Sequence, residues 1–494
     1  MEKKSIVDME KTDSIKKNYA YNTIYQILSF LIQFVTTPYV SRILGSSGIG
    51  VYSYTNSIVS YFMIFAALGT AGYGQREIAR HRDDKEDTSR IFWEIELLSV
   101  FTTGISVVIW SIWIIISSRY TIYYAVLTLS IISVAFDISW LYAGLEKFRL
   151  IVRKNAIVRI VGLLLIFTFV NVRSELLLYV GIMSATGLLG NVSMWTYLPK
   201  NIQKISIKRL HPFKLHLKQT FIYFIPTIAT FIYTMLDKTM IGAITKSESQ
   251  NGFYEQATKI VSMAESLLFS LNNVMYSRQS YLFSVGKTDE IKEKINKSFE
   301  YLTAVSVCFM FGITAGAANF VPWFFGKGYE PVIKLLCMMS PLPLVISISN
   351  ILGNQVLYPS GQRARSTRGI VAGTLTNVVL NSIMIPWYGA YGAVIASIAA
   401  ELVISLIYVH MSKDYISWKQ IWNIIWKKIA AGIVMALLIG LIGINSHGSV
   451  IITLIQLLTG TVIYMGVLIG LKDKFGSYII SEIKKRGKNG KAKP

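Results

Sequence analysis

Ionisable side chains lie inside several long apolar segments of this chain, and they are the residues most able to do chemistry. Three cations, Arg42, Lys238 and Lys259, fall near one end of their segments. Lys259 lies roughly 10 Å below that end if the segment is a helix. A charge at such depth is costly, so it commonly marks a pathway or a binding site. Lysine can hold an anionic group as a point charge, and arginine can hold it through two hydrogen bonds.

A second set of ionisable residues is placed differently. Asp237 and Lys238 are adjacent, about 100° apart around a helix, so they are poorly placed to pair with each other and at least one must face a polar interior. Arg159 lies deeper and is a further candidate to bind an anion. A buried carboxylate can exchange a proton between two states. We therefore expect a role in coupling or gating for the following carboxylates: Asp137, Asp237, Glu265 and Glu401.

Purely structural roles for these charges remain open alternatives. Glu255 and Lys259 are four residues apart and would pair on one helix face. Asp137 and Arg159 could form a salt bridge between helices, and Arg42 could extend to the outer interface. A further group lies near segment ends, where water would solvate it: Arg76, Glu94 and Glu96.

The elements that carry these residues are predicted to be membrane-spanning helices. The chain has 494 residues, of which 53% are hydrophobic and 15% charged, with a mean hydropathy of +0.48. The apolar runs reach about 20 residues, enough to cross a bilayer core of about 30 Å. We predict an all-α polytopic membrane protein with about 14 spans. They are 18–40, 50–75, 93–117, 121–143, 155–172, 176–198, 220–244, 252–276, 299–321, 331–357, 369–386, 389–411, 424–444 and 450–471.

The formal net charge of +22 is mostly a signal of membrane topology. With the N-terminus inside, most of the 49 lysines and arginines fall in the N-terminal segment, the even-numbered connections and the C-terminal tail. Such a bias predicts that both termini are cytoplasmic. The basic loops would contact anionic membrane lipids, and no nucleic-acid partner is expected.

Two similar stretches indicate an internal repeat. GVYSYTNSIVS begins at Gly50 and GFYEQATKIVS at Gly252. They open the second and eighth spans, so spans 1–6 and 7–12 are predicted to form two six-helix bundles related by a parallel repeat. The predicted domains are 1–210, 211–412 and a C-terminal part, 413–494. The last would hold an interfacial helix rich in tryptophan, two extra helices and a basic cytoplasmic tail.

The sequence lacks the motifs of the common catalytic and metal sites. It has no GxxxxGK[ST] and no HExxH, and its five histidines are scattered. The only two cysteines, Cys308 and Cys337, lie in predicted spans. We therefore predict no catalytic residues, no metal and no cofactor, and a protein that is not an enzyme.

Several stretches resemble a known family. They are PYVSRILGSSGIGVYSYTNSIV, YGQREIAR, FDISWLYAGLEKFRLIVRKN, FIPTIATFIYTMLDKTMIG and LYPSGQ. They are similar to Wzx-type polysaccharide repeat-unit flippases, the polysaccharide-transport branch of the multidrug/oligosaccharidyl-lipid/polysaccharide exporter superfamily. The resemblance implies a V-shaped cavity between two bundles and an undecaprenyl-diphosphate-linked oligosaccharide as cargo. It also implies that cavity cations hold the diphosphate and acidic sugars. This sequence would supply those cations as Arg42, Lys238, Lys259 and Arg159.

The expected function is a flippase in the bacterial cytoplasmic membrane that moves this cargo from the inner to the outer leaflet. The product would be a capsule, an exopolysaccharide or an O-antigen. The absence of a nucleotide motif leaves an ion gradient or removal of product as the driving force. Pathway partners would be a polysaccharide polymerase and glycosyltransferases. Two alternatives remain: an ion-coupled multidrug exporter of the same fold, and a membrane glycosyltransferase or polymerase.

Overall fold

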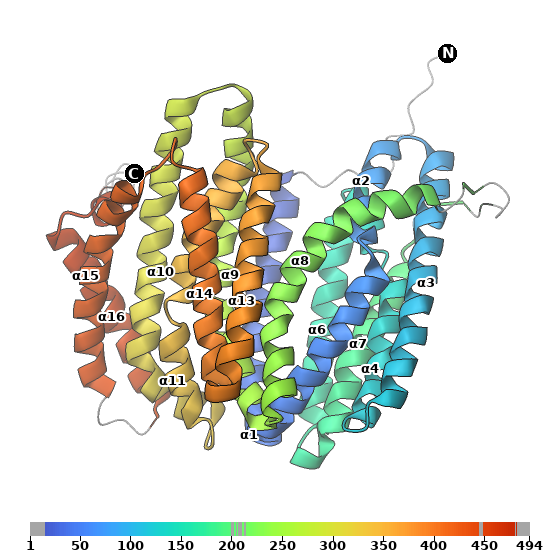
Figure 1. Ribbon diagram of the computed structural model, residues 1–494, viewed down its shortest axis with the longest axis horizontal. Helices are drawn as coiled ribbons and strands as arrows, with labels where there is room; N and C mark the ends of the chain where they lie inside the picture. Colours follow the sequence, from blue (N-terminus) through green and yellow to red (C-terminus); the bar gives the residue numbers. More distant parts are fainter. Residues whose placement is uncertain are drawn as a thin grey trace, which may run out of the picture. The chain divides into compact units, whose positions relative to one another are not determined.

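A computed structural model describes residues 15–198, 202–203, 205, 210–211, 214–443, 448–479 and 481. Within these residues the chain is almost entirely helical and has no β-strand (Figure 1). It divides into two compact units, Met1–Met235 and Leu236–Pro494, here called unit 1 and unit 2. The division falls inside helix α8 (Lys214–Thr245).

Unit 1 contains seven further described α-helices. They are α1 (Ile15–Ala67), α2 (Thr70–His81), α3 (Lys85–Ile116), α4 (Thr121–Ala135), α5 (Ser139–Gly144), α6 (Phe148–Phe169) and α7 (Leu176–Trp195). Two backbone features shape this unit. Gly45 has a φ of 67° and kinks α1, while Leu68 and Gly69 adopt positive φ between α1 and α2. Left-handed backbone of this kind is easy for glycine and breaks a helix.

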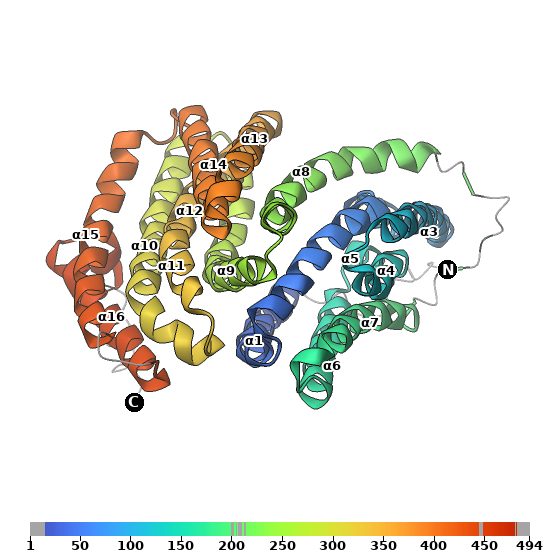
Figure 2. The same cartoon turned by 60° about the horizontal axis from the view of Figure 1, so that its bottom comes forward.

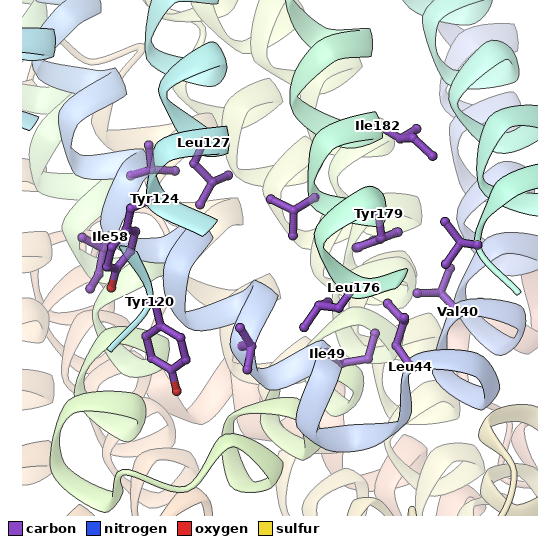
Figure 3. Packing of buried hydrophobic residues seen from close by; sticks show 14 of the residues in the cluster. Val40, Leu44, Ile49, Ile58, Tyr120, Tyr124, Leu127, Leu176, Tyr179 and Ile182 are labelled. Atoms are coloured by element: carbon purple, nitrogen blue, oxygen red, sulfur yellow. The ribbon is translucent and has the colours of Figure 1, made fainter. Parts of the chain in front are cut away.

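One hydrophobic core cluster of unit 1 lies mainly between α1, α4 and α7 (Figure 3). Its side chains are large and apolar, so they interdigitate as in a soluble protein core. The labelled members are Val40, Leu44, Ile49, Ile58, Tyr120, Tyr124, Leu127, Leu176, Tyr179 and Ile182.

Unit 2 contains the last turns of α8 and eight further described α-helices. They are α9 (Glu248–Ser284), α10 (Thr288–Phe325), α11 (Glu330–Met339), α12 (Leu342–Leu352), α13 (Arg363–Tyr388), α14 (Ala390–Met411), α15 (Trp418–Gly443) and α16 (Val450–Gly470). A π-helical turn, Gly353–Leu357, follows α12 directly. Helices α13 and α14 pack side by side, and α15 packs against α10 and α16 (Figures 1 and 2).

Each predicted span lies mostly on described helices, so the all-α polytopic membrane fold is confirmed. Ten helical runs in the described residues are long and apolar enough to cross a bilayer. One run, Leu28–His81, covers the second predicted span and the end of the first, whereas α6, α8 and α9 are not among the ten. The exact number of fourteen therefore stays a prediction. Many large apolar side chains are exposed, as in a protein surrounded by lipid tails: Ile115 is 84% exposed.

Trp418, Trp422 and Trp426 lie in the first turns of α15 and are all exposed. The tryptophan-rich segment, predicted to lie in the membrane interface, is thus continuous with the following span.

Candidate functional site

Lys238 and Lys259 lie together in unit 2, joined by one carboxylate. Glu255 Oε2 lies 2.7 Å from Lys238 Nζ, and Glu255 Oε1 lies 3.5 Å from Lys259 Nζ. We call these three residues the lysine cluster. The Glu255–Lys259 helix pair considered from the sequence is present. Its carboxylate, however, also binds a lysine from another helix, so the cluster combines two cations with one anion.

The turn between α8 and α9 positions the lysine cluster. Lys246 adopts a φ of 54°, and the Ser247 hydroxyl then caps α9 by accepting a hydrogen bond from the backbone N–H of Gln250. This short turn sets the last part of α8 beside the start of α9. Asn251 Nδ2 donates to the backbone carbonyl of Lys238 at 2.7 Å. Asn251 and Glu255, one turn apart on α9, therefore hold the backbone and the side chain of Lys238.

The neighbouring carboxylate, Asp237, faces a different set of partners. Its Oδ1 accepts hydrogen bonds from Asn377 Nδ2 at 3.1 Å and from Asn381 Nδ2 at 2.6 Å. Its Oδ2 accepts from the hydroxyls of Tyr254 and Ser397. Asp237 is only 6% exposed. These five residues, here called the carboxylate site, join α8, α9, α13 and α14 around one acidic group with four neutral donors. Adjacent Asp237 and Lys238 thus have separate partners, as their angle around the helix predicts.

Two more of the predicted coupling residues come together in unit 2. Glu265 in α9 and Glu401 in α14 lie within electrostatic range of each other. Glu401 is buried and accepts a hydrogen bond of 3.5 Å from the Ser349 hydroxyl. Ser349 belongs to α12, just before the π-helical turn, and such turns are frequent at functional sites.

The remaining predicted residues belong to unit 1. Arg42 is exposed on α1, shortly before the kink at Gly45. Arg159 is half-buried on α6, which packs against α1. Asp137 accepts a hydrogen bond of 3.0 Å from the backbone N–H of Ser139, at the break between α4 and α5. Asp137 thus supports that break, and it also lies within electrostatic range of Lys154.

The expectation that water solvates Glu94 and Glu96 is wrong, because each is only 3% exposed. Glu94 Oε2 lies 2.6 Å from His216 Nε2, and His216 Nδ1 lies 2.8 Å from the Tyr73 hydroxyl. The backbone N–H of His211 also donates to Glu94 Oε1 at 2.6 Å. The first turn of α8 therefore covers these ends of α2 and α3, and hydropathy along the chain carries no signal of that contact.

Sequence reasoning also missed the partners of Asp237. Asn377 and Asn381 are four residues apart in an otherwise apolar stretch, TNVVLN, and therefore share one helix face. Two amides on one face of a membrane helix need hydrogen-bonding partners inside the protein. That spacing was the available signal for the carboxylate site.

Comparison with known proteins supplies a family match. A family described as "Polysaccharide biosynthesis protein" matches residues 15–278. The "Putative O-antigen transporter" of Escherichia coli (strain K12) is 24% identical over 399 residues, which are 79% of this chain and 95% of that protein. The "Probable low-salt glycan biosynthesis flippase Agl15" of Haloferax volcanii is 25% identical over 251 residues, half of each chain.

Solved structures show the same fold. The lipid II flippase MurJ in an inward closed conformation superposes with a TM-score of 0.65 at 17% identity, covering 88% of this chain and 98% of that one. An inward-facing multidrug transporter of the MATE family gives a TM-score of 0.62 at 13% identity, covering 81% of this chain and 95% of the other. At these identities the likeness establishes the architecture alone.

Proposed function

The chain belongs to the polysaccharide biosynthesis protein family, and we propose that it is a flippase for lipid-linked oligosaccharides. The cargo is an oligosaccharide repeat unit on undecaprenyl diphosphate, carried from the inner to the outer leaflet of the bacterial cytoplasmic membrane. The relatives named as an O-antigen transporter and a glycan flippase support this proposal. The transported repeat units are used to build a capsule, an exopolysaccharide or an O-antigen. Moving this cargo makes or breaks no covalent bond, so the protein is a transporter rather than an enzyme.

The lysine cluster is the observation that carries the proposal. A diphosphate cannot cross hydrocarbon without compensating positive charge, because an isolated ion in that medium is strongly unfavourable. Two ammonium groups within membrane helices, 16% and 31% exposed at their side chains, can supply that charge. Arg42 and Arg159 on unit 1 are proposed as further contacts for the diphosphate or for acidic sugars. The polyprenyl tail stays in the lipid, so the protein need shelter only the polar part.

Asp237 is the carboxylate best placed to couple transport to an ion gradient. Its two oxygens accept hydrogen bonds from donors on three other helices, so a change of charge at this group would be felt at α9, α13 and α14. Because Asp237 is followed directly by Lys238, a change of charge at one is felt at the other. Asp137, Glu265 and Glu401 remain further candidates for coupling or gating.

A transport assay tests the function. The full-length protein is reconstituted into liposomes with an undecaprenyl-diphosphate oligosaccharide labelled on its sugar, and arrival at the outer leaflet is measured with a lectin. Lys238→Ala with Lys259→Ala should reduce the rate at least about tenfold, since each loses a charge-assisted contact. Lys246→Ala, in the adjacent turn, is the matched control and should keep the rate. Normal flipping by the double variant would contradict the proposed site.

Deletion of the gene in its natural host separates the other functions. Loss of surface polysaccharide with lipid-linked precursor retained inside supports flipping. Normal polysaccharide with new drug sensitivity would indicate the multidrug exporter. Failure to lengthen glycans that already lie outside would indicate a polymerase.

The proposed orientation has both termini in the cytoplasm, where polymerase and glycosyltransferases of the same pathway could meet the protein. A single cysteine at position 246, in a chain with Cys308 and Cys337 replaced by serine, should react with a membrane-impermeant thiol reagent in intact cells. A cysteine at position 208 or 488 should react only after the membrane is opened. The reverse result would invert the orientation.

A further inference from the structure

We propose that Glu255 is an internal anion that occupies the two lysines in the absence of cargo and is displaced from at least one of them by the cargo's diphosphate. This inference rests on the proposed function and adds a role for a residue that the cation pattern alone does not assign. In this view Glu255 sets the affinity of the site, and therefore how readily the cargo leaves.

The contacts of Glu255 with the two lysines are unequal. Lys238 Nζ lies 2.7 Å from the carboxylate and its side chain is 16% exposed, whereas Lys259 Nζ lies 3.5 Å away and is 31% exposed. The first distance is that of a charge-assisted hydrogen bond, and the second is a looser ion pair. Lys259 is therefore the lysine that an incoming anion reaches first and removes most easily from Glu255.

Lys238 is fixed more firmly than Lys259. The side-chain amide of Asn251, which is fully buried, donates to the Lys238 carbonyl at 2.7 Å. The ion pair with Glu255 then anchors the side chain from the same face of α9. We assign Lys238 as the fixed cation of the site and Lys259 as the cation that changes partner.

The charges favour exchange of this kind. One carboxylate offers two oxygens to two ammonium groups, each of which has three N–H donors. A diphosphate brings more negative charge and more acceptor oxygens, so it can bind both lysines at once. The retained carboxylate repels the bound diphosphate over a short distance in a medium of low polarity, where such repulsion is strong. Binding is thereby weakened enough for release on the other side of the membrane.

The two copies of the repeat support a joint role for Glu255 and Lys259. In the aligned stretches Ser53 takes the place of Glu255, and Ser57 the place of Lys259. Both serines are buried, and the Ser57 hydroxyl donates to the backbone carbonyl of Tyr54 within its own helix. Glu255 and Lys259 thus occur together in unit 2. In unit 1 both positions hold serine, a small residue that can be buried between packed helices.

Binding of a short soluble analogue tests the inference. The probe is geranyl diphosphate, titrated against the full-length protein in lipid nanodiscs. Glu255→Gln keeps the shape of the side chain and removes its charge, so the probe should bind at least about tenfold more tightly than to the wild type. The same variant should flip labelled undecaprenyl-diphosphate oligosaccharide more slowly at saturating cargo, because release becomes limiting. Glu248→Gln, in the first turn of the same helix, is the control and should change neither value.

The outcomes separate the inference from the proposed function. If Glu255→Gln binds the probe as the wild type does, or more weakly, while Lys238→Ala and Lys259→Ala lose binding, the internal-anion role is overturned and the lysine site stands. If the two lysine variants bind as tightly as the wild type, the proposed site itself fails. Glu255→Asp keeps the charge but shortens its reach toward Lys259, and serves if the glutamine variant does not fold. It should also bind more tightly than the wild type, and equal or weaker binding would overturn the inference.

Discussion

Substitutions at Asp237 can distinguish a structural role of its carboxylate from a role in coupling transport to an ion gradient. Replacement by asparagine keeps the size of the side chain and one acceptor oxygen. That oxygen should turn toward Asn377 and Asn381, whose amide nitrogens at 3.1 and 2.6 Å can only donate. The new amide nitrogen would then face the Tyr254 and Ser397 hydroxyls, which can rotate and accept. All four partners keep a hydrogen bond in Asp237→Asn.

The expected energies follow from that geometry. A hydrogen bond to a charged group is worth about 1 kcal/mol more than one between neutral groups, so Asp237→Asn weakens the four bonds. The substitution also removes the free-energy cost of burying a charge, and this stabilises the variant. The free energy of unfolding should therefore change by no more than about 2 kcal/mol. Asp237→Ala instead removes the acceptor of Asn377 Nδ2 and of the Tyr254 and Ser397 hydroxyls, at about 1–3 kcal/mol for each donor left unsatisfied. Asn381 Nδ2 keeps a hydrogen bond to Asn377 Oδ1 at 3.0 Å.

The assay measures both quantities on each variant. Thermal unfolding of the purified protein should show Asp237→Asn close to the wild type and Asp237→Ala clearly lower. In liposomes Asp237→Asn should lose the response of flipping to an imposed proton or sodium gradient, because the side chain no longer carries a negative charge. Unchanged gradient dependence in Asp237→Asn, or equal stability of the two variants, would refute this reasoning.

Four further substitutions test other parts of the fold. Gly69→Ala should lower the melting temperature in a thermal shift assay, because its Cβ would lie 2.6 Å from the Thr220 carbonyl oxygen at a φ of 75°; a wild-type melting temperature would contradict the close packing of α8 on this turn. Lys428→Ala should cost about 3–5 kcal/mol in denaturant unfolding, because it leaves two carboxylates, at 2.5 and 3.2 Å from the buried ammonium, without their cation. Glu265→Gln or Glu401→Gln should weaken the gradient dependence of flipping, and full transport with an unchanged response would remove both from the coupling candidates.

Much of the fold was predictable because lipid imposes strong rules on sequence. A segment within the bilayer must satisfy its own backbone hydrogen bonds, so long apolar runs become helices. The helix pair Glu255 and Lys259 was equally accessible, since a spacing of four residues fixes neighbours within one helix. The break at Leu68 was harder to predict, because its positive φ interrupts a helix inside the predicted span 50–75, whereas Gly45 lies in the predicted connection between the first two spans.

Contacts between distant segments were decided by the tertiary structure alone. Asp237 meets Asn377 and Asn381 across 140 and 144 residues, and hydropathy does not say which helix face turns toward which neighbour. The position of Glu94 near a segment end predicts a solvated residue, whereas in the structure His216 at the start of α8 covers it. The sequence by itself determined the helical membrane-spanning architecture and the identity of the charges, and the internal repeat stays a prediction. Only packing decided which charges on different helices are joined, because such a partner depends on helices brought together in three dimensions.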